Sequence, residues 1–236
     1  MGEGLAFQGV GRVRGEGLDI AVPGDWLESS GEGVHVAVVD TSLDDPVAGV
    51  EERDIFPGRP APPMKPFHSR FVCSVILSIA PLCRVVLYPA ILWGRVGTPE
   101  LAAALGAAGA ADVINLSLAY GVDDSAVRAL LEKAGRSGSL IAASHNPRMP
   151  WPAAYGMVVS AAGSGGDVNI DDRAFGMRGA SYSAAKLSGL FALAKSADRG
   201  VPSSMVLEAL SSLNPGFQAP PCRQPPSNSR HFRARG

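Results

Sequence analysis

The chain has 236 residues, of which 46% are apolar and 18% are charged, with a formal net charge of −1. A chain of this length and composition can bury a sizeable core, so a long disordered protein is excluded. The near-neutral charge gives no reason to expect nucleic acid or a membrane surface as a partner.

In chain order, the sequence predicts a strand at 34–39, helices at 68–79 and 98–109 with a strand at 84–91 between them, a strand at 112–118, a helix from Asp123 or Asp124 to Gly138, strands at 140–143 and 157–161, and helices at 181–195 and 203–212. The strands are short, nearly continuous apolar runs, which are typical of strands buried on both faces. In the helix predicted to end at Gly138, Val127, Leu130, Leu131 and Ala134 have the spacing of one helix face.

Strands separated by helical segments predict an α/β fold, a doubly wound and mostly parallel sheet with helices on both faces. Active sites in such sheets lie at the carboxyl ends of the strands. This rule makes Asp40, Leu118–Ala119 and His145–Asn146 neighbours, because each of these positions follows a predicted strand.

The two ends of the chain differ from the middle. Residues 1–25 are glycine-rich and weakly patterned, and they form an N-terminal extension that can hold a short strand pair. Residues 26–213 form the main domain. Residues 214–236 are rich in proline and arginine, contain no acidic residue, and are expected to form a disordered tail.

The three cysteines, Cys73, Cys83 and Cys222, have no C-x-x-C spacing. This pattern favours reduced, mostly buried thiols over a zinc site. The first residues lack the basic and apolar regions of a signal peptide, and no apolar run reaches the roughly 18 residues of a transmembrane helix. The sequence therefore predicts a cytoplasmic protein with no membrane partner.

Five segments carry residues suited to chemistry. They are VAVVDTSLDD at 36–45, HSRFVCSVILSIAP at 68–81, ADVINLSLA at 111–119, IAASHNPRMPWPAAYGMVVSAAG at 141–163 and GASYSAAKLSGLFALA at 179–194. In this order and spacing they resemble the sequence blocks of the subtilisin family of serine peptidases, over roughly residues 26–213. The chain order aspartate, histidine, serine is also that of subtilisin.

The resemblance implies a serine endopeptidase in which Asp40, His68 and Ser181 form the catalytic triad. A serine hydroxyl is a poor nucleophile until a base takes its proton, and His68 is the expected base. Asp40 is expected to hold the imidazole tautomer and to stabilise the imidazolium. The start of the helix at Ser181 and the side chain of Asn146 are expected to stabilise the oxyanion.

The resemblance also implies a peptide or protein substrate. In the family, the strand end equivalent to Ser117, Leu118 and Ala119 pairs with the substrate backbone, and the opposite wall corresponds to Ala142, Ala143 and Ser144. A peptide held as an added strand fits this arrangement. No cofactor is expected, and no calcium is expected between residues 79 and 84, because this connection is too short for the calcium loop of some relatives.

Several family positions are altered. Ser42 replaces the glycine of Asp-Thr-Gly, and Ser69-Arg70-Phe71 replaces the Gly-Thr-His that follows the histidine. Ala119 replaces a glycine of the substrate strand. In the serine block, Ala180, Ala185 and Lys186 replace threonine, proline and histidine. These changes and the short chain suggest either a dedicated processing protease or a pseudoenzyme that binds a peptide or protein partner without cutting it.

Two further folds are disfavoured. The first is a nucleotide-binding α/β domain, because Gly31-Glu32-Gly33 precedes a strand, whereas a phosphate-binding loop follows one. The serine block lacks the second glycine of G-x-S-x-G, and the order of the three candidate residues is wrong for an α/β-hydrolase.

Overall fold

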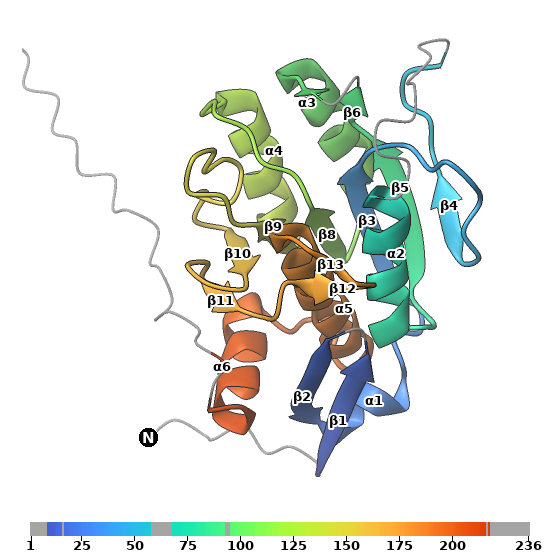
Figure 1. Cartoon of the computed structure of the whole chain (residues 1–236), viewed down its shortest axis with the longest axis vertical. Coiled ribbons are helices and arrows are strands. Elements are labelled where there is room, and N and C mark those ends of the chain that lie inside the picture. The colour runs from blue at the N-terminus through green and yellow to red at the C-terminus, as the bar shows by residue number, and fades with distance from the viewer. Residues whose placement is uncertain (1–8, 16, 58–67, 93–94, 216, 218–236) are drawn as a thin grey trace, which may run out of the picture.

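A computed structural model describes residues 9–15, 17–57, 68–92, 95–215 and 217 (Figure 1). Its centre is a seven-stranded sheet in the order β11-β10-β9-β8-β3-β5-β4. Every neighbouring pair in it is parallel. The strands are β3 (His35–Asp40), β4 (Val50–Glu52), β5 (Arg84–Pro89), β8 (Val113–Leu116), β9 (Leu140–Ser144), β10 (Val158–Ala162) and β11 (Val168–Asn169).

Helices cover both faces of the sheet. They are α1 (Gly24–Glu28), α2 (His68–Ile79), α3 (Thr98–Ala108), α4 (Ser125–Arg136), α5 (Ala180–Ala197) and α6 (Ser203–Leu213). Successive side chains of a strand point to opposite faces, so Val36 and Val38 pack in one core with α2, α5 and α6. Ala37 and Val39 pack in a second core with α3 and α4. The predicted α/β fold, doubly wound and mostly parallel, is confirmed.

The ten elements predicted between residues 34 and 212 are all present, with small shifts at their ends. Asp124 rather than Asp123 caps α4, because its Oδ1 accepts hydrogen bonds from the backbone N–H groups of Ala126 and Val127. Asp123 instead forms an ion pair with Arg128, with Nη2 and Oδ2 2.6 Å apart.

The N-terminal extension contains an antiparallel strand pair, β1 (Val10–Gly15) and β2 (Leu18–Pro23). Val13 and Ile20 of this pair are buried in the core on the α5 face. The side chain of Asn214 donates to Ala21 O at 2.7 Å and accepts from Ala21 N at 2.8 Å. Phe217 is buried as well. The rest of the predicted tail, residue 216 and residues 218–236, lies outside the described residues.

Cys73 and Cys83 are buried and carry free thiols. Burial raises the pKa of the Cys83 thiol to about 12 and also raises the pKa of Cys73. Cys222 lies outside the described residues. None of the helices in the part of the chain that the structure describes has the length and apolar character needed to cross a membrane.

Candidate active site

Asp40 and His68 form a hydrogen-bonded pair at the carboxyl edge of the sheet. Asp40 is the last residue of β3 and is fully buried. Its Oδ1 accepts from His68 Nδ1 at 2.8 Å and from Thr41 N at 2.7 Å. His68 is the first residue of α2, and its side chain is 29% exposed. Because Nδ1 is held by the carboxylate, the other ring nitrogen, Nε2, faces away from Asp40 and can act as a base.

Ser181 lies in the first turn of α5, the helix that packs along α2. Its side chain is half-buried, and its hydroxyl donates to the carbonyl oxygen of Ser117 at 3.2 Å. The ring of the next residue, Tyr182, lies 6.4 Å from the His68 ring, measured between centroids. Burial raises the pKa of Tyr182, and the Asp40 carboxylate raises it further. The structure therefore gathers the three predicted triad residues in one region, with the aspartate–histidine contact formed.

Two helices of the site region, α2 and α5, approach each other closely at Gly189. A Cβ atom added to Gly189 of α5 would lie 2.8 Å from the Cβ of Ile79 at the end of α2. Real Cβ atoms essentially never come this close, so glycine permits the contact. A larger side chain at position 189 would clash with Ile79, so the end of α2 would have to shift.

Two of the altered family positions contact each other beside the aspartate–histidine pair. The buried hydroxyl of Ser69 donates to the carbonyl oxygen of Ser42 at 3.0 Å. This bond joins the first turn of α2 to the loop that follows Asp40. Arg70 approaches Asp45 from the same turn, with Nη1 and Oδ2 3.8 Å apart. The two substitutions thus add a connection between the segments that carry Asp40 and His68.

A buried polar network, which the sequence analysis does not predict, joins β8 to the first half of α5. Asn115 donates through Nδ2 to Ser188 Oγ at 3.0 Å. The hydroxyl of Ser117 makes bonds to Asn115 Oδ1 at 2.9 Å and to the backbone oxygen of Ser181 at 3.1 Å. Buried polar groups need such partners. The signal for this network was an asparagine inside the otherwise apolar run of β8.

Asn146 follows β9 at the same edge and is half-buried. Its Oδ1 accepts from the backbone N–H of Arg148 at 3.0 Å, which is a local turn contact. Since the oxygen is held in this way, the Nδ2 group is the part of the side chain that can donate to a ligand.

The predicted substrate-binding residues lie at the ends of β8 and β9. Ser117, Leu118, Ala143 and Ser144 are buried and Ala119 is half-buried. The Ser144 hydroxyl donates to Leu118 O at 3.2 Å, so the two predicted walls are joined. An antiparallel bridge between Tyr120 and Trp151 follows Ala119 directly.

Lys186, which stands at the position of a family histidine, is fully buried on α5. Its Nζ donates to the carbonyl oxygens of Asp171 at 2.8 Å and Arg173 at 2.7 Å. These bonds hold the segment that leads toward Ser181 against the helix. An apolar side chain at this position would leave two carbonyl groups without their donor.

We expect Lys186→Met to lower the free energy of unfolding by about 2 kcal/mol or more, since each buried acceptor left unsatisfied costs about 1–3 kcal/mol. Urea denaturation measures the change. Lys133→Met is the matched control, because Lys133 is exposed on α4, and it should change stability by no more than about 0.5 kcal/mol. Equal effects of the two substitutions would contradict the role of Lys186.

The chain is similar to a number of solved structures, including three structures of proteases. The prenylagaramide maturation protease PagA has a TM-score of 0.59 and 21% identity, covering 75% of this chain and 81% of that one. A serine-to-alanine mutant of the protease domain of PatA has a TM-score of 0.58 and 18% identity, covering 72% and 82%. A lanthipeptide protease has a TM-score of 0.62 and 17% identity, covering 77% and 80%.

The fold is subtilisin-like. No family model and no curated protein matches the sequence. At these identities the likeness establishes the fold, and the chemistry of the site depends on its own residues.

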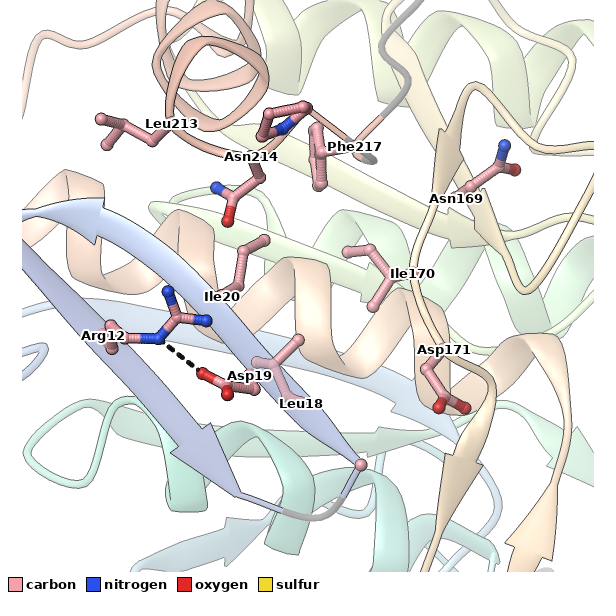
Figure 2. A pocket seen from close by; sticks show the side chains of 12 residues that line it. Arg12, Leu18, Asp19, Ile20, Asn169, Ile170, Asp171, Leu213, Asn214 and Phe217 are labelled. Carbon is pink, nitrogen blue, oxygen red and sulfur yellow. Dashed lines mark hydrogen bonds and ion pairs between the residues drawn. The ribbon is translucent and has the colours of Figure 1, made fainter.

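A cavity lies away from the candidate active site. Figure 2 shows a cavity of about 420 Å³ between β2, β11 and the end of α6, with the Arg12–Asp19 ion pair on its wall. Of the described residues that line it, none belongs to the predicted catalytic or substrate-binding set. Among the described residues, no group of three or more His, Cys, Asp or Glu side chains is arranged to hold a metal ion.

Proposed function

We propose that this protein is a serine endopeptidase that cleaves peptide bonds through an acyl-enzyme, with Asp40, His68 and Ser181 as its triad. The observation that carries the proposal is the 2.8 Å hydrogen bond between His68 Nδ1 and the buried Asp40 carboxylate, next to the helix that begins with Ser181 in its first turn. A buried carboxylate paired with a partly exposed imidazole is an arrangement that serves a general base.

The proposed reaction begins when Ser181 Oγ attacks the scissile carbonyl carbon and His68 Nε2 takes the hydroxyl proton. The negative charge moves to the carbonyl oxygen, where the Asn146 Nδ2 group and the backbone N–H groups at the start of α5 stabilise it. His68 then gives its proton to the leaving amine as the C–N bond breaks. Water then attacks the carbonyl carbon of the acyl-enzyme while His68 takes a water proton. His68 gives this proton to Ser181 Oγ as the C–Oγ bond breaks, which restores the hydroxyl.

The Ser181 hydroxyl must turn before it can react, because it donates to Ser117 O in the structure. In the family, this strand end pairs with the substrate backbone. A substrate N–H that donates to Ser117 O would compete with the hydroxyl and favour its rotation toward His68. This contact is also the observation that favours the alternative of a pseudoenzyme, in which the hydroxyl stays on Ser117 O and the peptide is bound without being cut.

The substrate class that we propose is a peptide precursor, so that the enzyme has a processing role. Among the similar structures, PagA is a maturation protease, the PatA structure is a protease domain, and another is a lanthipeptide protease. The altered positions at Ser42, Ser69 and Ala119 support a dedicated rather than a broad specificity. Reaction with a fluorophosphonate probe tests whether a base activates Ser181, as the peptidase proposal requires. A purified, folded protein that fails to react would contradict it.

Asn146 provides a separate test of the oxyanion site. We expect Asn146→Asp to keep the turn, since a carboxylate oxygen can still accept from Arg148 N, but to remove the donor. Activity should fall by about 10²–10³ in kcat with little change in KM. Asn146→Ser should lower kcat to the same extent if the serine hydroxyl accepts the hydrogen bond from Arg148 N. Steady-state kinetics on a cleaved peptide decide the point, and a loss confined to KM would assign Asn146 to ground-state binding instead.

A further inference from the structure

A short β-hairpin, to which the proposed mechanism assigns no role, lies beside the candidate triad. It consists of β12 (Arg173–Ala174) and β13 (Met177–Arg178), which pair antiparallel across the two-residue turn Phe175-Gly176. Figure 1 shows the hairpin next to α2 and in front of α5. The chain passes from it through Gly179 directly to Ser181.

The turn of this hairpin holds a phenylalanine in an unfavourable backbone conformation. Phe175 has φ 51° and Gly176 has φ 76°. Two-residue hairpin turns with positive φ at both positions strongly prefer Asn, Asp or Gly at the first of them. A bulky residue is uncommon there, and such strain tends to persist at functional sites. The turn itself therefore does not explain the choice of phenylalanine.

The ring of Phe175 contacts the helix that carries His68. Its centroid lies 5.1 Å from that of Phe71, with the rings tilted by 31°. Phe71 follows His68 by three residues on α2, so the two side chains share one face of the helix. Phe175 nevertheless stays 38% exposed. Phe71 is half-buried and also packs against the core on the α5 face, so the pair joins this core to an apolar surface that Phe175 presents to solvent.

The hairpin is anchored at its base and sides. Lys186 Nζ binds the carbonyl oxygen of Arg173 at 2.7 Å. The backbone N–H of Gly179 donates to Asp172 O at 2.9 Å. The Tyr182 hydroxyl donates to Met177 Sδ at 3.6 Å. A surface fixed in this way can bind a ligand without first being ordered, which lowers the cost of binding.

The chemistry decides which part of a substrate meets this surface. The acyl side of the scissile bond is expected at the ends of β8 and β9, beside Ser117 and Ser144. The leaving amine must reach His68, because His68 is the group that protonates it. The peptide that follows the scissile bond therefore passes His68 and the Phe71 ring that shares its helix face.

We infer that Phe71 and Phe175 bind the first side chain after the scissile bond and select an apolar residue there. The inference rests on the proposed peptidase function. It assigns the specificity of the leaving side of the cut to two residues that lie outside the catalytic machinery.

The test measures how the acyl-enzyme divides between water and added amines. An acetylated dipeptide methyl ester forms the acyl-enzyme and releases methanol, which offers no side chain to the Phe71–Phe175 surface. Leucinamide, phenylalaninamide or glycinamide is then offered at equal concentration. The amine nitrogen attacks the ester carbonyl, the new C–N bond forms as the C–Oγ bond breaks, and the amine proton passes through His68 to Ser181 Oγ. Mass spectrometry gives the ratio of amide to acid.

We expect the wild-type enzyme to favour leucinamide and phenylalaninamide over glycinamide by about tenfold or more, as for other apolar side-chain contacts. Phe175→Asn, which suits the positive φ of the turn, and Phe71→Ala should each reduce this preference severalfold. Neither should change the rate at which the methyl ester is hydrolysed when no amine is added. Glycinamide serves as the internal control, because it offers no side chain to the surface.

The outcomes separate the inference from the proposed function. Ester turnover with no preference among the amines in the wild type would overturn the inference and leave the peptidase proposal standing. A preference that survives in both folded variants would also overturn it, because the selection would then lie elsewhere. No turnover above that of Ser181→Ala would contradict the peptidase proposal, and the inference would fall with it.

Discussion

Ser181→Ala should abolish labelling by a fluorophosphonate and lower peptide cleavage by about 10⁴-fold or more. The Oγ atom is the proposed point of attachment, and a methyl group offers no atom that can attack a carbonyl carbon. In the structure the hydroxyl donates to Ser117 O at 3.2 Å, and the side chain is only half-buried. Its loss should therefore change stability by less than about 1.5 kcal/mol.

The matched control for this variant is Ser183→Ala. Ser183 lies in the same helix two residues further on, is fully buried, and donates to Ile170 O at 2.8 Å. Its removal should lower stability by about 1–3 kcal/mol but leave the probe attached to the folded protein. Intact-protein mass spectrometry reads the label, and circular dichroism checks the fold. Labelling that persists in Ser181→Ala would place the reactive residue elsewhere.

Asp40→Asn should reduce kcat by about 10³–10⁴-fold while the protein remains folded. The carboxylate accepts from His68 Nδ1 and Thr41 N through one oxygen, Oδ1, and its other oxygen, Oδ2, is buried and has no hydrogen-bond partner among the described residues. An asparagine that keeps its oxygen on His68 retains the geometry but loses the charge that stabilises the imidazolium. The flipped amide would instead turn an N–H toward His68 Nδ1 and Thr41 N, both of which are donors.

Asp45→Asn tests whether any loss of charge near α2 has the same effect. Asp45 lies in the loop after β3, and its side chain is 75% exposed and 3.8 Å from Arg70. Exposed ion pairs contribute little to stability, so this variant should keep nearly full activity. Steady-state kinetics with one peptide compare the two variants. Equal losses in both, or an active Asp40→Asn, would contradict the proposed role of Asp40.

The main elements of the fold could be predicted from the sequence because their signals are local. Continuous apolar runs predicted β3, β8 and β9, and the i, i+3, i+4, i+7 spacing predicted α4. The short strands β11, β12 and β13 have two residues each. Hydrogen bonds between distant segments define such strands, and two residues carry no periodicity. They were accordingly not predicted.

The candidate site, like the fold, could be predicted only in part from the sequence. The types and order of Asp40, His68 and Ser181 could be recognised from motifs, and their catalytic roles stay predictions. The contact that brings α2 against α5 depends on Gly189 and Ile79, which are distant in sequence and carry no chemical signal. In the sequence, Lys186 could be recognised only as a departure from the family pattern. Its function as a donor to the carbonyl groups of Asp171 and Arg173 depends on the tertiary fold, which places the segment before α5 against that helix.

The distribution of the three candidate residues along the chain has a consequence for biosynthesis. Asp40 and His68 lie in the first third of the sequence, and Ser181 lies much later, on a helix buried along most of its length. A ribosome releases the N-terminal segments first, so the growing polypeptide holds an acid and a base long before it holds a nucleophile. On the proposed triad, its own unfolded segments and its neighbours in the cell would meet an inert chain until α5 has emerged and packed against the sheet and α2.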